Sequence, residues 1–157
     1  MPNIMTITTH AAIGAVIGFS IGNPWLGFLL GFISHFLVDM IPHGDSRLSV
    51  KYRIQKKKRG PVTFATIDAL IALYIILGLV NLPISTSQTA LTAAIAGSVL
   101  PDLLVGFFDM TKSRYLKKFV KIHFFFHDFF TTRFGDIKLH QAIFGQAVVV
   151  VGLLNLL

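Results

Sequence analysis

The sequence contains no cysteine and no glutamate, and only 13% of its 157 residues are charged. The absence of cysteine excludes disulfides and thiolate metal sites. Because glutamate is also absent, the seven aspartates are the only carboxylate side chains, so a transition-metal site would need His and Asp ligands. With 54% hydrophobic residues and a mean hydropathy of +0.71, the chain is too apolar for a soluble domain of this length. We interpret it as an integral membrane protein.

The length predicts a single domain over residues 1–157, and no internal repeat or low-complexity linker interrupts it. The opening Met1-Pro2-Asn3-Ile4 lacks a basic region, and no small-residue cleavage site follows, so we expect no cleaved signal peptide.

Long apolar runs predict an all-α, polytopic membrane helix bundle with about five transmembrane helices. The expected spans are Ile7 to Gly22, Pro24 to about Ile41, Pro61 to about Leu82, about Thr89 to Met110, and about Lys138 to Leu157. Glycines spaced by four in the first two predict a tight hairpin that permits close helix approach. The segment 119–134 is rich in phenylalanine but short and close to charge, so we expect a short interfacial or re-entrant helix there. Whether that segment crosses the membrane is left open.

The 14 basic residues are concentrated beside the apolar runs, with seven between Arg47 and Arg59 and five between Lys112 and Lys121. The turns at Asn23 and at Asn81–Gln88 contain none. The positive-inside rule therefore predicts a protein of the cell (inner) membrane with its N-terminus and both basic loops in the cytoplasm. Anionic lipid headgroups and topology explain the net charge of +7, so membrane lipids are expected partners and nucleic acid is not.

The stretch from Ser34 to Asp45 contains the strongest chemical signal, because two imidazoles and two carboxylates fall within eleven residues. His35 and Asp39 are four apart, so a helix places them on one face within reach of a common ion. Pro42 then breaks the helix, which lets His43 and Asp45 fold back. Imidazole and carboxylate together favour zinc or a similar divalent ion, with manganese as the alternative. The structural alternative is that His35 and Asp39 only hydrogen-bond each other inside the bundle.

With the predicted topology, the remaining His and Asp candidates approach the same membrane leaflet. Asp68 lies inside the third span, and an uncompensated acid at mid-bilayer costs about 2.5–3.5 kcal/mol on insertion scales, so it is a functional candidate. Pro101 could kink the fourth span beside Asp102 and free a carbonyl group. Nine groups exceed the needs of one tetrahedral ion, which makes a two-metal site plausible. The nine are His10, His35, Asp39, His43, Asp68, Asp102, His123, His127 and His140.

The order and spacing of these motifs resemble the YdjM-like family of membrane-bound metal-dependent hydrolases. The resemblance rests on Thr9-His10, His35-x3-Asp39-x2-Pro42-His43-x-Asp45, Gly97-x3-Pro101-Asp102 and His123-x3-His127, and it covers almost the whole chain. Through that family the chain is distantly similar to zinc-dependent phospholipase C and the related single-strand nucleases, which hold a cluster of zinc ions. The resemblance implies phosphoester hydrolysis at two or three zinc ions. The ligands it implies are His10, His35, Asp39, His43, Asp68, Asp102, His123 and His127.

The function that we expect is hydrolysis of a phosphoester, in a phospholipid or a lipid-linked phosphate, by a metal-activated water at the cytoplasmic side. Asp45 or Asp128 would orient a ligand or act as the base. One alternative is a metal or proton transporter, which would need ionisable groups in the far halves of the helices as well. Another is a non-catalytic membrane scaffold whose His and Asp pairs only join helices. The sequence leaves the oligomeric state and the roles of Asp109 and His140 open.

Overall fold

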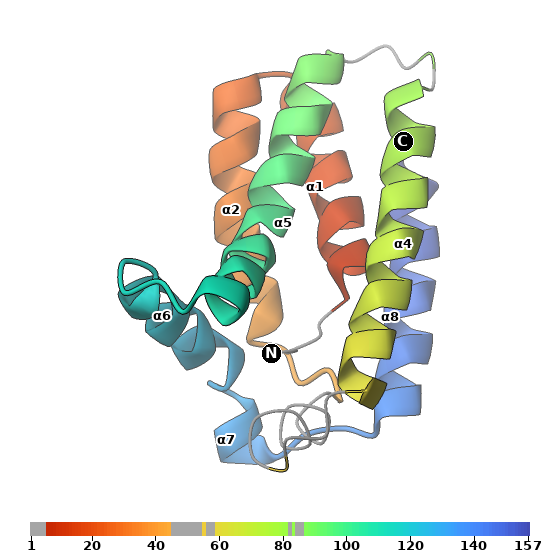
Figure 1. The fold of residues 1–157 in the computed structure, drawn as a ribbon. Coiled ribbons are helices and arrows are strands. Elements are labelled where there is room, and N and C mark those ends of the chain that lie inside the picture. Colours follow the sequence, from red (N-terminus) through yellow and green to blue (C-terminus); the bar gives the residue numbers. More distant parts are fainter. Residues whose placement is uncertain (1–5, 45–54, 56–58, 82, 84–86) are drawn as a thin grey trace.

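The computed structural model of the chain describes residues 6–44, 55, 59–81, 83 and 87–157 (Figure 1). Within these residues the chain consists of helices and their connections, with no strand, which confirms the all-α prediction. Five apolar helices lie close to the predicted ranges: α1 (Ile7–Ile21), α2 (Pro24–Asp39), α4 (Arg59–Asn81), α5 (Gln88–Thr111) and α8 (Leu139–Leu154). The segment 119–134 forms most of α6 (Lys117–His127) and α7 (Thr131–Phe134).

The α1–α2 connection follows from three adjacent residues whose backbone preferences agree. Gly22 ends α1 at a φ of +65°, a left-handed conformation that favours glycine. The side chain of Asn23 caps α2 by accepting a hydrogen bond from the Leu26 N–H at 3.0 Å. Pro24 then occupies the first helical position, where its missing N–H costs nothing. The predicted turn at this point is confirmed.

Glycines of α1 and α2 bring both helices against α5, and these three helices pack against one another on one side of the bundle (Figure 1). A Cβ atom added at Gly18 would lie 2.6 Å from the Cα atom of Leu91, and one added at Gly31 would overlap the carbonyl oxygen of Ala94. On α5 itself, a Cβ atom at Gly97 would overlap the carbonyl oxygen of Phe28. The glycine faces therefore allow close packing as predicted, but the helix that they approach most closely is α5.

The helices α4 and α8 pack on the other side of α1 (Figure 1). The contact between α1 and α8 includes a partly buried polar cluster. The Gln146 side-chain oxygen accepts hydrogen bonds from the Thr6 N–H at 2.8 Å and from the Thr6 hydroxyl at 2.9 Å. The Thr9 hydroxyl donates to the same oxygen at 3.3 Å. Three donors on one oxygen fix the position of α8 along α1, which apolar packing alone would not do.

Two of the helices, α4 with 23 residues and α5 with 24, are long and apolar enough to cross a membrane. The other apolar helices have 15 or 16 residues, which at about 1.5 Å per residue is shorter than the ~30 Å hydrocarbon core. Much of the surface of α4 is apolar and exposed, including Leu70, Leu73 and Tyr74, so its outer face suits lipid. Within the described residues, helix length alone therefore supports two spans, fewer than the five expected.

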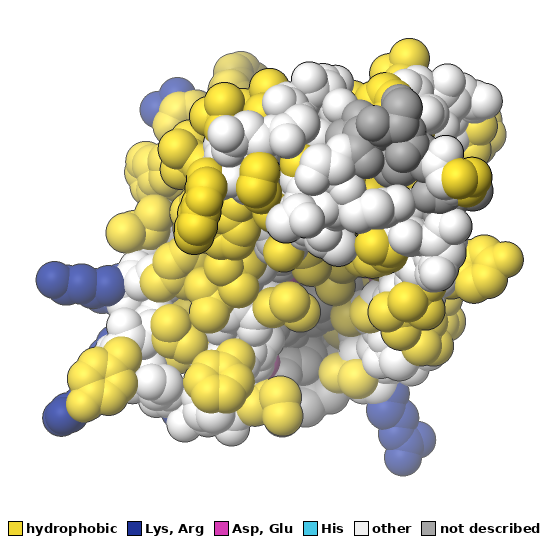
Figure 2. Space-filling view, turned by 90° about the horizontal axis from the view of Figure 1, so that it is seen from above, with side chains coloured by type: hydrophobic (Ala, Val, Ile, Leu, Met, Phe, Trp, Pro, Cys, Tyr) yellow, Lys and Arg dark blue, Asp and Glu magenta, His cyan; other side chains and the backbone are white. Residues whose placement is uncertain are grey.

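The two ends of the bundle differ in charge. Figure 2 views the end where α1 joins α2, where α4 ends and where α5 begins; among the described residues, Lys and Arg side chains appear there only at the rim. The opposite end carries α6 and α7 (Figure 1), with Lys117, Lys118 and Lys121 exposed on α6. Of the basic residues between 47 and 59, only Arg59 lies within the described part of the chain.

Candidate metal centre

Four side chains from three helices meet at the end of the bundle that carries α6. The helix α2 contributes His35 and Asp39 one turn apart, α5 contributes Asp102 directly after Pro101, and α6 contributes His123. One ligand atom from each residue lies within 4.8 Å of the other three. The predicted pairing of His35 and Asp39 on one face is confirmed, and the fold adds one candidate ligand from each of two distant segments.

The distances within this group of four, called the metal centre below, suit one small cation. The Nε2 atom of His35 lies 3.2 Å from Oδ2 of Asp39 and 3.8 Å from Oδ1 of Asp102. The Nε2 atom of His123 lies 3.7 Å and 3.8 Å from the same two oxygens. Ligands at about 2.0–2.1 Å from a tetrahedral zinc ion are about 3.3–3.4 Å apart, so small side-chain movements would complete this geometry.

Three of these converging atoms lack hydrogen-bond partners among the described residues, although their side chains are buried. The three are Nε2 of His35, Oδ2 of Asp39 and Nε2 of His123; Nδ1 of His123, elsewhere on that ring, lacks a partner as well. The relative exposure of these three side chains is 0%, 2% and 1%. A buried polar group without a partner costs about 1–3 kcal/mol, and here three such groups point at one another. A shared cation would satisfy the converging atoms together, so the residues present fit a divalent metal ion.

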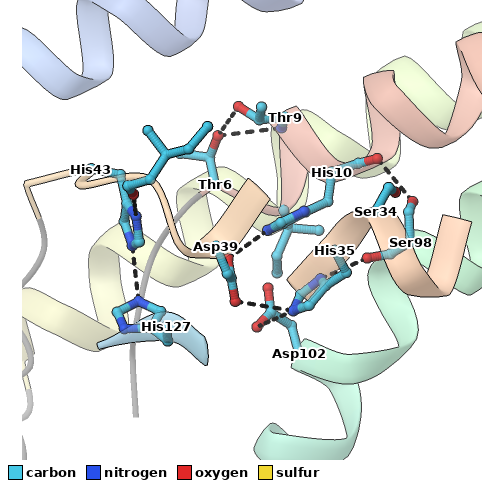
Figure 3. A network of polar contacts seen from close by, with 12 residues as sticks. Thr6, Thr9, His10, Ser34, His35, Asp39, His43, Ser98, Asp102 and His127 are labelled. Atoms are coloured by element: carbon cyan, nitrogen blue, oxygen red, sulfur yellow. Dashed lines mark hydrogen bonds and ion pairs between the residues drawn. The ribbon is translucent and has the colours of Figure 1, made fainter. Parts of the chain in front are cut away.

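Neighbouring groups hold His35 and Asp39 in orientations that suit this role. The ring Nδ1–H of His35 donates to the carbonyl oxygen of Ser98 at 2.8 Å, so that in the neutral form of the ring the lone pair is on Nε2 and is directed at the centre (Figure 3). Pro101 lacks an N–H for the Gly97 carbonyl, so α5 is irregular in hydrogen bonding beside this contact. On the other side, His10 from α1 pairs through Nε2 with Oδ1 of Asp39 at 3.1 Å, and its ring stacks on His35.

Phenylalanine rings surround His123 and exclude water from its side of the centre. Phe36 and Phe124 lie edge-on to the His123 ring at 6.1 Å and 5.4 Å between centroids, and Phe119 lies at 6.5 Å. Burial in these surroundings lowers the pKa of His123 to about 3. The imidazole is therefore neutral near pH 7, which is the form that binds metal.

His43 and His127 form a second pair beside the centre, with their Nε2 atoms 2.9 Å apart (Figure 3). The Nδ1–H of His43 donates to the carbonyl oxygen of Ile41, and Nδ1 of His127 lies 2.9 Å from a carboxylate oxygen of Asp128. Because carbonyl and carboxylate oxygens can only accept, both Nδ1 atoms carry the proton of a neutral ring, and both Nε2 atoms carry lone pairs. The contact at 2.9 Å is therefore a hydrogen bond when one of the two rings carries a second proton, and two nitrogens that share one zinc ion would lie slightly further apart.

Asp68 is not part of the metal centre, although the resemblance implied a ligand role for it. Its carboxylate accepts hydrogen bonds from the Ile7 N–H and the Thr8 hydroxyl, both at 2.6 Å, and from the Thr8 N–H at 3.4 Å. These are the unpaired donors of the first turn of α1, so Asp68 caps that helix from α4. This buried acid therefore has structural partners.

The Asp68→Ala substitution is expected to lower the free energy of unfolding by about 1–3 kcal/mol, because it leaves buried N–H groups of α1 unpaired. The metal content of the folded protein should not change. Thermal unfolding and metal analysis of the same samples would check both statements. Asp109→Ala is the matched control, since Asp109 pairs with the exposed Lys112 and such a pair contributes only about 0–1 kcal/mol. Loss of metal without loss of stability would identify Asp68 as a ligand instead.

The remaining candidates have separate positions. Asp45 lies outside the described residues. Asp128 contacts His127, a member of the second histidine pair, and not the four residues of the metal centre. His140 is exposed in the first turn of α8, and Asp109 pairs with Lys112 at the end of α5.

Sequence reasoning missed the part played by Ser98, whose carbonyl orients His35 and whose hydroxyl donates to the His10 carbonyl at 2.8 Å. A serine between Gly97 and the Pro-Asp pair in an apolar helix was the available signal.

Comparison of the chain with protein-family models, curated proteins and solved structures gave no match.

Proposed function

We propose that this protein is a membrane-embedded, metal-dependent hydrolase that cleaves a phosphoester in a phospholipid or a lipid-linked phosphate. The observation that carries the proposal is the convergence of buried ligand atoms without hydrogen-bond partners at the metal centre. Hydrogen bonds that only join helices would satisfy these atoms, as the donors of α1 satisfy Asp68, whereas these atoms have no such partner among the described residues. The similarity of the motifs to the YdjM-like family supports the same proposal, and membership of that family is part of it.

The proposed topology has the N-terminus and the basic segments in the cytoplasm. Its five membrane spans are α1, α2, α4, α5 and α8. The contrast between the two ends of the bundle supports this topology. It brings the metal centre to the cytoplasmic side, where α6 would lie along the lipid headgroups. The short helices α1, α2 and α8 would be accommodated by local thinning of the bilayer.

The chain's own residues have distinct proposed roles. His35, Asp39, Asp102 and His123 hold the ion, zinc by preference or manganese, and His10 keeps the Asp39 carboxylate turned toward it. The bound ion would lower the pKa of a water molecule and neutralise charge on the phosphoryl oxygens. Hydrolysis would then replace the bond between phosphorus and the ester oxygen by a bond to the water oxygen, and the departing alcohol would take up a proton from that water. The second pair, His43 and His127, is the proposed position of a further ion, with Asp128 orienting His127.

Hydrolysis of phosphoesters by the detergent-purified chain tests this proposal, with His35→Gln as the variant. We expect the wild type to release the alcohol from lipid phosphoesters and His35→Gln to lose at least about 100-fold in rate, because even partners of metal ligands contribute about 10–100-fold. Circular dichroism would verify that both proteins remain helical. Equal turnover by a folded, metal-free His35→Gln protein would refute the metal-dependent mechanism.

A further inference from the structure

An aromatic groove of about 440 Å³ lies on α6, α7 and their connection, next to the metal centre. Its walls are Phe124, Phe125, Phe129, Asp128, Thr132 and Arg133, and we call it the α6–α7 groove. Phe125 is 62% exposed, so the groove opens at the surface of the protein. Three phenylalanine rings beside an arginine match an amphiphile with an apolar chain and an anionic head.

Arg133 is held in place over one wall of the groove. Its guanidinium carbon lies over the Phe129 ring, 4.4 Å from the centroid, which is a cation–π contact. The guanidinium has five N–H donors, so this contact leaves N–H groups available to a phosphate. The exposed Lys117, Lys118 and Lys121 on α6 add positive charge to this end of the bundle.

The groove and the metal centre share a wall. The ring of Phe124 lies 5.4 Å from that of His123 and 6.4 Å from that of His127, measured between centroids. Asp128 lines the groove and also bonds to His127. A lipid in the groove would therefore lie beside the metal centre.

We propose that the α6–α7 groove binds one anionic membrane phospholipid, with an acyl chain along Phe124, Phe125 and Phe129 and its phosphate at Arg133. Free phosphate would gain no binding free energy from the three phenylalanine side chains, whereas an acyl chain would bury apolar surface against them. Exposed Ile122 and Phe134 extend the apolar surface on α6 and α7, as expected for elements that lie in the membrane interface. That this lipid is also the substrate class rests on the proposed function.

Lipid quenching of a single tryptophan tests the groove without any measurement of turnover. In the full chain, Trp25→Phe removes the one native tryptophan and Phe125→Trp places a reporter in the groove. In nanodiscs of phosphatidylcholine, brominated phosphatidylglycerol should quench this reporter at about fivefold lower mole fraction than brominated phosphatidylcholine, the factor for about 1 kcal/mol per basic residue near lipid. Inorganic phosphate should not reverse the quenching.

Matched variants separate the groove from general lipid contact. Arg133→Gln should abolish the preference for the anionic lipid, whereas Arg114→Gln should preserve it, because Arg114 stacks on Tyr115 in the same manner but outside the groove. A reporter at Tyr74→Trp, on the exposed face of α4, should show no preference. Equal quenching by both lipids, or a preference that survives Arg133→Gln, would overturn the proposal. Reversal by inorganic phosphate would identify an anion site instead.

The two proposals can fail separately. Lipid preference in a protein that binds no metal would leave the groove intact and refute the hydrolase. Metal-dependent turnover without lipid preference would support the hydrolase and refute the lipid site in the α6–α7 groove.

Discussion

Detergent-purified wild-type protein is expected to retain about one zinc or manganese ion per chain at the metal centre, and Asp39→Asn is expected to lose it. Asp39 is the residue on which the centre depends most, because one carboxylate oxygen faces His35 and His123 while the other bonds to His10. The amide has nearly the same size but carries no charge. We expect metal affinity to fall by more than about 100-fold, beyond the 10–100-fold effect of changing a partner of a ligand.

Mass spectrometry of metals, with circular dichroism on the same samples, measures this effect. Asp109→Asn is the control, since Asp109 is a carboxylate of α5 that pairs with Lys112 away from the centre. The control should bind as much metal as the wild type, and all three proteins should remain helical. A metal-free wild type that is fully folded would refute the metal centre, and an Asp39→Asn protein with unchanged metal content would exclude Asp39 as a ligand.

The helices could be predicted from the sequence because their boundaries are local. Thr6, Asn23 and Ser87 cap the helices that follow them, and each accepts a hydrogen bond from a backbone N–H three residues away. The pairing of His35 with Asp39 was equally local, since helical periodicity alone places residues four apart on one face.

Which of the candidates converge on the metal centre, and which bond to backbone groups instead, could not be predicted. Asp68 and Asp102 are both aspartates inside apolar helices. Because a buried acid costs free energy in such a helix, both are candidates for a functional role. The difference lies in partners far away in the sequence: Asp68 meets the N–H of Ile7, 61 residues earlier, whereas Asp102 meets His35 and His123. Only the packing of α1 against α4, and of α5 between α2 and α6, decides which acid is satisfied by backbone groups.

The number of membrane spans was also beyond local reasoning. Hydropathy identified five apolar runs correctly, but the caps at Thr6 and Asn23 make α1 and α2 short. Helix length supports α4 and α5 as spans, and the other three depend on how the bundle sits in a bilayer.

Gly97→Ala is expected to be the most destabilising single-methyl change in the bundle. The same change should also disturb the metal centre. A Cβ atom there would overlap the backbone carbonyl of Phe28, and backbone cannot move aside as a flexible side chain can. Overpacking of this kind costs about 1–3 kcal/mol or more. The change would force α5 away from α2, and α5 carries both Asp102 and the Ser98 carbonyl that orients His35.

We therefore expect Gly97→Ala to lower the unfolding temperature and the metal content together. Gly78→Ala is the matched control, because nothing lies within 4 Å of the position that its Cβ atom would occupy in α4. Alanine is the better helix former by about 1 kcal/mol, so this control should be as stable as the wild type or more stable. Thermal unfolding in detergent and metal analysis measure both effects. If Gly97→Ala and Gly78→Ala behaved alike, the close contact between α5 and α2 would be wrong, and with it the position of Asp102 beside His35.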